Sequence, residues 1–195
     1  MNVPPLILAS ASPRRRQLLQ EAGYRFTVIA PAISEQLGLC SNCGPAELVA
    51  ELAQAKAADV LARVREDRQY AQHVVLACDT VAACQGHILG KPRDEQHARQ
   101  MLMLLSGQAH HVYTGICLWP VTGTTPQVAV EVTALQMDPL GERQLDRIID
   151  SGLWKDKAGA FGYQDGLDWV HITAGSESNV VGLPLERLKN MLESL

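Results

Sequence analysis

The chain has 195 residues, enough to bury a full hydrophobic core within one domain. Its net charge is −4, with 47% hydrophobic and 19% charged residues, which is ordinary for a globular protein and disfavours a nucleic-acid coat. No apolar run approaches the roughly 18 residues of a membrane span. No basic stretch precedes the first apolar run either, so we expect neither a membrane anchor nor a secretory signal.

Apolar periodicity and turn residues predict alternating strands and helices along the chain. Strands are expected at about 6–9, 26–29, 73–77, 81–84, 88–89, 110–119, 128–137 and 169–173, and helices at about 13–21, 46–65, 94–105, 142–150 and 185–192. Gly86 permits a hairpin turn between the strands at 81–84 and 88–89. This order predicts an α/β fold with a mixed sheet in a single domain over residues 1–195.

The first strand is followed by an arginine-rich helix start, Ser10-Ala-Ser-Pro-Arg-Arg-Arg16. Ser12 is a natural N-cap and Pro13 suits the first helical position. Three arginines are electrostatically out of place there, because a helix N-terminus already carries partial positive charge. They make sense if a strongly anionic group binds in front of them, and a polyphosphate is the obvious candidate.

Asp79 and Thr80 follow the apolar strand predicted at 73–77. Ligands bind at the carboxyl ends of strands in open α/β sheets. An aspartate there can hold Mg²⁺ or activate a water. A turn-forming Asx residue is an equally good interpretation of the position alone.

Two lysines and a glycine-rich segment are further candidates. Lys56 lies among alanines of the predicted helix 46–65, where it could extend outward to solvent or point into a cleft. Lys91 precedes a proline, which suits a phosphate partner but is more typical of a solvated loop. Residues 155–166 combine charged side chains with three glycines, which permits close backbone approach to a ligand. The apolar Ala158, Ala160 and Phe161 argue against a fully solvated loop there.

Five cysteines are an odd number without the spacing of a disulfide framework, so we expect a reducing cytoplasm. Cys40 and Cys43 form a Cys-x-x-Cys pair, which could be a redox pair or half of a zinc site. The sequence has no second such pair, and we interpret both as incidental loop cysteines.

Taken together and in this order, the motifs resemble the Maf family of nucleoside triphosphate pyrophosphatases. The matching segments are Ala9–Arg15, Glu35, Ala55–Ala57, Cys78–Val81, Gly90–Arg93, Leu105–Gly107, Tyr113–Gly115, Asp156–Gln164 and Asn179–Leu185. Each is weak alone, whereas the ordered set is specific and spans nearly the whole chain.

The resemblance implies an elongated mixed sheet with flanking helices and two lobes around a cleft, related to inosine triphosphate pyrophosphatases. It also implies hydrolysis of a nucleoside triphosphate to the monophosphate and pyrophosphate, assisted by Mg²⁺ or Mn²⁺. A homodimer is implied only by the resemblance.

The same resemblance implies roles for individual residues. Asp79 matches the proposed general base, and Glu35 and Asp79 would hold the metal. The phosphate-binding positions are Ser10, Arg14, Arg15, Lys56 and Lys91. Arg16 is not part of the motif, and we expect it to be an ordinary solvated residue.

Within the family, this chain is more similar to the dTTP/UTP branch than to the branch that acts on 7-methyl-GTP. Arg14, Thr80 and Gln164 are the specificity positions, and a glutamine suits a pyrimidine edge because it offers a donor and an acceptor. Two residues depart from the usual pattern: Glu177 replaces a common aromatic, and Asp165 separates Gln164 from Gly166.

Three alternatives stay open at this point. The chain could be a 7-methyl-GTP-type pyrophosphatase, a nucleotide-binding division regulator without turnover, or a nucleic-acid-binding module. Retention of Asp79, Glu35, Lys56 and Lys91 disfavours the pure binder, since a binder needs no base. The net charge and the single basic cluster disfavour nucleic acid as a partner.

Overall fold

A computed structural model describes residues 3–33 and 44–195. The described residues fold into two compact units. The first unit comprises Met1–Asp79, Thr114–Glu131 and Gly182–Leu195, and the second comprises Thr80–Tyr113 and Val132–Val181. Strands β3, β5 and β6 contribute residues to both units.

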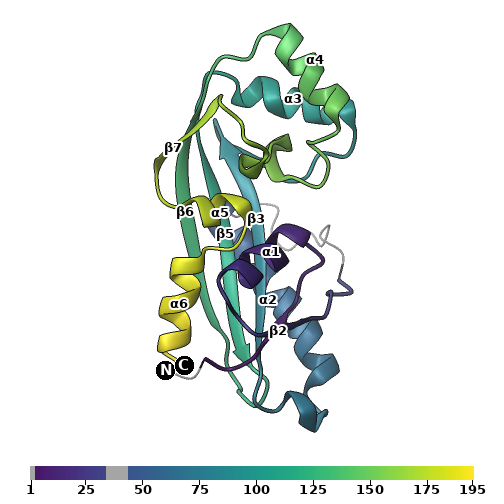
Figure 1. Cartoon of the computed structure of the whole chain (residues 1–195), viewed down its shortest axis with the longest axis vertical. Helices are drawn as coiled ribbons and strands as arrows, with labels where there is room; N and C mark the ends of the chain where they lie inside the picture. The colour runs from purple at the N-terminus through teal and green to yellow at the C-terminus, as the bar shows by residue number, and fades with distance from the viewer. Residues whose placement is uncertain (1–2, 34–43) are drawn as a thin grey trace. The chain divides into compact units, whose positions relative to one another are not determined.

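Seven strands of the described residues form one mixed sheet with the order β2-β1-β3-β5-β6-β7, and β4 pairs with β3 (Figure 1). The strands are β1 Leu6–Leu8, β2 Phe26–Val28, β3 Val74–Cys84, β4 His87–Leu89, β5 Ala109–Pro120, β6 Gln127–Met137 and β7 Val170–Ala174. β1 pairs in parallel with both β2 and β3, whereas the β3–β4 and β6–β7 pairs are antiparallel. The predicted mixed α/β sheet is confirmed.

The helices flank this sheet. They are α1 Pro13–Glu21, α2 Pro45–Val64, α3 Glu95–Leu105, α4 Glu142–Ser151, α5 Glu177–Val181 and α6 Leu185–Glu193, with short 3₁₀ turns at Arg68–Tyr70, Ala158–Ala160 and Tyr163–Asp165. No helix among the residues that the structure describes is long and apolar enough to cross a membrane.

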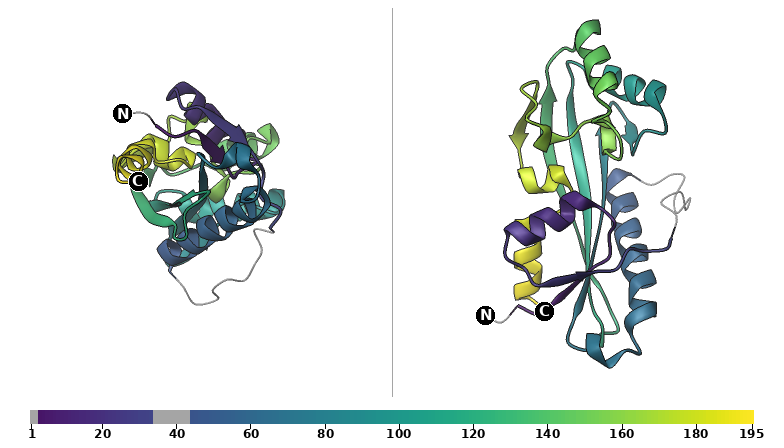
Figure 2. Two further views of the ribbon diagram at one scale, coloured as in Figure 1. Left: turned by 90° about the horizontal axis from the view of Figure 1, so that it is seen from below. Right: turned by 45° about the vertical axis from the view of Figure 1, so that its right-hand side comes forward.

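In the first unit, α2 covers one side of the strands, and α1 and α6 lie on the other side (Figure 2). The buried face of α2 packs through Ala53, Ala57 and Val60 onto Val75 and Cys117 of the sheet. Small residues on this face allow the helix to approach the strands closely, which is the geometry that brings a helix side chain within reach of a strand side chain.

In the second unit, α3 and α4 enclose a separate apolar cluster with the ends of β3, β5 and β6. Leu102 and Leu105 of α3 are fully buried there, and Phe161 and Trp169 bring in the irregular segment before β7. Asp94 caps α3, since its Oδ1 accepts a hydrogen bond of 2.7 Å from the His97 amide.

The largest difference from the sequence-based prediction concerns β3. The sequence predicts that the strand at 73–77 ends at Asp79 and Thr80, with 81–84 continuing extended, but β3 runs as one strand from Val74 to Cys84. Asp79 therefore lies in the middle of a buried strand, and the Asx-turn interpretation is wrong. A buried carboxylate is tolerated in a strand only when another group compensates its charge.

Candidate functional site

The arginine-rich turn has the predicted local geometry. α1 begins at Pro13, and the Ser12 side chain accepts a hydrogen bond of 3.4 Å from the Arg15 amide. The Ser10 hydroxyl accepts one of 3.1 Å from the Ser12 amide, so two serines order the helix start. No acidic side chain lies in the first turn of α1. The first turn thus presents backbone N–H groups and cations, which together favour an anionic ligand.

Arg15 is held in place from two sides within the first unit. Its Nε donates a hydrogen bond of 2.7 Å to the Gly182 carbonyl, and its Nη1 donates one of 3.3 Å to the Ser10 hydroxyl. A guanidinium fixed in this way loses less side-chain entropy when it binds an oxyanion. Arg14 is half-buried, and Arg16 is exposed, as expected for a residue outside the motif.

Lys56 and Asp79 form a buried ion pair. The Lys56 ammonium Nζ lies 2.6 Å from Asp79 Oδ1, and only 4% of the lysine side chain and 10% of the aspartate side chain is exposed. The outward orientation considered for Lys56 is therefore wrong. Because the ammonium binds Oδ1, the second carboxylate oxygen, Oδ2, can orient a water molecule.

The pKa of the Cys78 thiol indicates that charged groups of the first unit lie near one another. Burial raises the pKa of the Cys78 thiol to about 11, against opposing effects of the Arg15 and Lys56 cations. Both cations thus act electrostatically on the residue next to Asp79. The structure brings together four predicted site residues: Ser10, Arg15, Lys56 and Asp79.

A glycine permits the close approach of α2 to β5 in the same unit. A Cβ atom on Gly115 would lie 2.1 Å from the Val49 carbonyl oxygen and 2.8 Å from the Ala50 amide nitrogen. No side chain fits there, because both neighbours are backbone atoms of α2. Gly115 therefore sets the spacing at which the α2 backbone, and with it Lys56, meets the sheet.

The second unit holds the other described positions. Lys91 is exposed and follows β4 by two residues. The Gly90 carbonyl, immediately before it, accepts a hydrogen bond of 3.1 Å from the Gly159 amide. This bond places the glycine-rich segment beside the Lys91 loop. Thr80 is half-buried on β3, and Gln164 is exposed within the 3₁₀ turn Tyr163–Asp165.

The sequence analysis did not select Lys157 as a site residue. Its side chain is only 10% exposed, and its ammonium forms an ion pair with the carboxylate of Asp165. The sequence does contain an indication of this pair. Ala158, Ala160 and Phe161 argue against a fully solvated segment, and a lysine that is buried beside apolar residues needs a charged partner.

Glu35, Cys40 and Cys43 lie outside the described residues. Within residues 3–33 and 44–195, no group of three or more His, Cys, Asp or Glu side chains is arranged to hold a metal ion. The described part of the chain thus has no cage of protein ligands of the kind that structural metals require.

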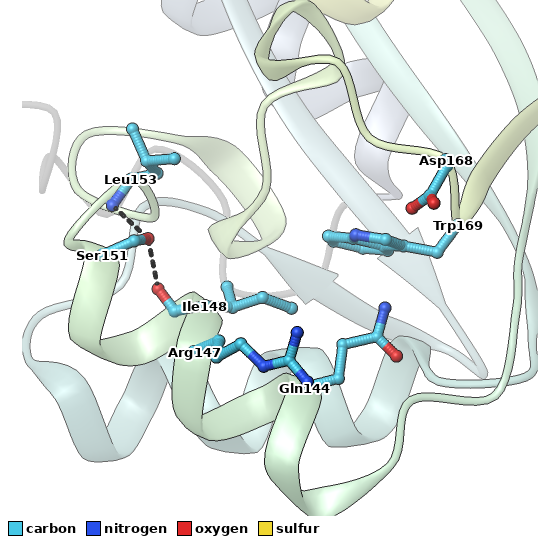
Figure 3. A pocket seen from close by; sticks show the side chains of 7 residues that line it. All are labelled: Gln144, Arg147, Ile148, Ser151, Leu153, Asp168 and Trp169. Carbon is cyan, nitrogen blue, oxygen red and sulfur yellow. Dashed lines mark hydrogen bonds between the residues drawn. The ribbon is translucent and has the colours of Figure 1, made fainter.

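A pocket of about 420 Å³ opens in the second unit between α4 and the residues that precede β7 (Figure 3). Trp169, Arg147 and Gln144 line it, and at its rim the Ser151 hydroxyl bonds the Ile148 carbonyl at 2.7 Å. None of the predicted site residues lines this pocket.

Comparison with known proteins identifies close relatives. The chain is 52% identical over 194 residues to a protein of Rhodopirellula baltica named dTTP/UTP pyrophosphatase, covering 99% of this chain and 83% of the relative. It is 43% identical over 190 residues to a dTTP/UTP pyrophosphatase of Halalkalibacterium halodurans, covering 97% and 95%. A third dTTP/UTP pyrophosphatase, from Carboxydothermus hydrogenoformans, is 41% identical and covers 94% of both chains.

Among solved structures, the Staphylococcus aureus Ham1 protein matches 97% of this chain and 98% of its own with a TM-score of 0.52. At 10% identity this likeness bears on the fold alone, and it confirms the predicted mixed sheet with flanking helices. The model of the family described as Maf-like protein matches residues 5–195. The chain therefore belongs to the Maf family.

Proposed function

We propose that this chain hydrolyses dTTP and UTP to the nucleoside monophosphate and pyrophosphate. Three relatives that share 41–52% identity with it carry the name of that activity. The observation that carries the proposal is the Lys56–Asp79 pair at 2.6 Å beside the arginine turn. It supplies a carboxylate for water and fixed cations for phosphate within one unit.

The arginine turn would bind the triphosphate. The α1 N–H groups and the guanidinium groups of Arg14 and Arg15 neutralise phosphate oxygens, and Arg15 is already oriented by Ser10 and Gly182. Such pre-positioned cations act mainly in the transition state, where charge accumulates on the transferring phosphorus group. In the second unit, we assign Lys91 to phosphate and Gln164 to the base.

Asp79 would act on the attacking water. Its carboxylate accepts the water proton as the water oxygen bonds to the α-phosphorus, and the bond to the bridging oxygen breaks with release of pyrophosphate. Lys56 holds the carboxylate in one rotamer and balances its charge while it is buried. Positioning and charge stabilisation supply most of the rate in phosphoryl transfer.

The donor chemistry of the site fits a divalent cation. Mg²⁺ is usually bound by one or two carboxylates together with substrate phosphates and waters, and the Asp79 carboxylate lies next to the proposed phosphate turn. We propose that Asp79 holds Mg²⁺ or Mn²⁺, with Glu35 as a second ligand. When bound, the ion neutralises phosphate charge.

The test measures pyrophosphate release from dTTP, UTP, CTP, GTP and 7-methyl-GTP, each with Mg²⁺ or Mn²⁺ and with a chelator as control. We expect release from dTTP and UTP to be fastest and to stop with the chelator. Fastest release from 7-methyl-GTP would assign the chain to the other branch. Tight binding without any release would leave a nucleotide-binding regulator and overturn the enzyme assignment.

A further inference from the structure

The Lys157–Asp165 ion pair in the second unit differs from an ordinary surface pair. The side chains are only 10% and 21% exposed. A pair that is removed from water to this extent is strong only when its geometry is good and its surroundings hold it.

The backbone of Gly162 lies directly against the pair. A Cβ atom at this position would lie 2.5 Å from Asp165 Oδ2 and 2.7 Å from Lys157 Nζ. The absence of a side chain at Gly162 is therefore what lets the lysine reach the aspartate. This glycine, the lysine and the aspartate form one unit of local structure, which we call the 157/165 clasp.

The clasp holds the turn that carries Gln164. The Asp165 amide donates a hydrogen bond of 3.0 Å to the Gly162 carbonyl, which closes the 3₁₀ turn Tyr163–Asp165. The Asp165 carboxylate then ties the end of the turn to Lys157. Gln164 is the middle residue of this turn and is exposed. The turn is tied twice, while its central side chain extends toward solvent.

The anchor of the clasp is rigid. Phe161 is 7% exposed and packs edge-on against the His110 ring, with 5.5 Å between the ring centroids. The Gly159 amide bonds the Gly90 carbonyl. Lys157 therefore belongs to a segment fixed to the core of its unit. Its ion pair with Asp165 restricts the turn in which Gln164 lies.

We propose that Asp165 is a positioning residue for base recognition, which acts through Lys157 to orient Gln164. The inference rests on the proposed function, because it assumes that Gln164 contacts the base. Uracil and thymine present an N–H donor flanked by carbonyl acceptors, whereas cytosine presents an acceptor and an amino donor. A glutamine amide fits either pattern by rotating through half a turn. Discrimination then depends on where the turn places the amide, so a displaced turn changes the preference between the two bases.

The test compares Asp165→Asn with Asp168→Asn. Both substitutions remove one negative charge from an exposed residue of the same segment, but Asp168 lies outside the clasp. The readout is the ratio of kcat/KM for dTTP to kcat/KM for dCTP. We expect Asp165→Asn to lower this ratio about tenfold, at the lower end of what a misplaced polar contact changes, and Asp168→Asn to leave it unchanged.

Further variants test whether Asp165 acts through Lys157. Gly162→Ala keeps both charges but displaces them, and we expect the same loss of ratio, which also serves if Asp165→Asn does not fold. Lys157→Met should lower the ratio as well, and adding Asp165→Asn to it should change nothing more.

The outcomes separate the two proposals. Equal losses for dTTP and dCTP would mean a merely structural ion pair and would overturn the inference, as would additive losses in the Lys157→Met Asp165→Asn double variant. An unchanged ratio in both Asp165→Asn and Gly162→Ala would overturn it too. If the unmodified protein releases no pyrophosphate from dTTP, the proposed function fails first and the inference falls with it.

Discussion

Within the part of the chain that the structure describes, a lysine–aspartate pair is buried in the first unit and another is partly buried in the second, and the two are built differently. Lys56 and Asp79 lie on regular elements, helix α2 and strand β3, and are 23 residues apart in sequence. Lys157 and Asp165 are eight residues apart on an irregular segment. The first pair is 4% and 10% exposed, and the second is 10% and 21% exposed.

The difference separates two uses of the same chemistry. On α2 and β3 the backbone is fixed by the sheet and the core, so the pair holds a carboxylate for reaction. On the glycine-rich segment short turns fix the backbone through single hydrogen bonds, and the pair adds a further constraint. The position of Asp79 depends on the fold, whereas the position of Gln164 depends on a side-chain contact.

The largest expected effect comes from breaking each pair by the same substitution. Lys56→Met should lower the free energy of unfolding by about 3–5 kcal/mol, since it leaves a buried carboxylate without its cation. Lys157→Met should cost about 1–3 kcal/mol, because Asp165 is closer to water. Urea unfolding of both variants measures the difference, and equal losses would remove the distinction between the pairs.

The two glycines that adjoin the pairs sharpen the comparison. Gly115→Ala should cost roughly 3 kcal/mol, the upper part of the usual range for overpacking, because the new methyl group meets α2 backbone. At Gly162 the methyl group meets the ends of two flexible side chains, so Gly162→Ala should cost about 1 kcal/mol. Thermal and urea unfolding test both, and a reversed order would contradict the packing argument.

Removing the reacting carboxylate should lower turnover in a protein that still folds, with some loss of stability because Lys56 is left buried without its anion. Asp79→Asn keeps a hydrogen-bond acceptor for Lys56 but cannot take a proton, so we expect kcat to fall at least about 100-fold. Glu51→Gln on the exposed face of α2 is the control for the loss of one charge. Near-normal turnover in a correctly folded Asp79→Asn protein would remove Asp79 from its proposed role.

The smallest expected effect is a pH dependence of stability in the second unit. Burial lowers the pKa of His110 below its ordinary value of 6.5, against the opposing effect of the hydrogen bond that its ring donates to the Gln108 carbonyl. The unfolded chain therefore binds a proton at a higher pH than the folded chain does. The stability contribution is complete above pH 6.5 and is lost as the pH falls from there through the folded pKa. His110→Gln should flatten this part of the profile, and an unchanged profile in urea unfolding from pH 7 to 5 would contradict it.

The sequence predicts the elements whose signals are local. Ser12, Pro13 and Gly23 bound α1, and the helix begins and ends where they predict. The failure at β3 has a non-local cause, because Asp79 is tolerated in a strand only through Lys56, which the local pattern does not show. Helix α5 was not predicted, since its five residues resemble a turn and it is held by Asn179, which bonds Thr133 at 2.9 Å.

The candidate site also contains residues that the sequence predicts and a pair that it does not. Ser10 and Arg15 were predictable because the serine cap and the arginines lie within one turn of chain. The Lys157–Asp165 pair was not predictable, because its formation depends on the missing side chain at Gly162 and on the left-handed backbone of Gly159 and Ala160. The sequence shows which residues have charged or hydroxyl side chains, but which of them pair depends on how the chain packs.

We propose above that Asp79 directs water to the α-phosphorus of the substrate. Hydrolysis of dTTP in water enriched in the heavy oxygen isotope, followed by mass spectrometry of the products, tests it most directly. If water attacks the α-phosphorus, we expect the label to enter the nucleoside monophosphate and pyrophosphate to stay unlabelled. Label in pyrophosphate, or release of labelled orthophosphate, would place the attack on another phosphorus and contradict the account.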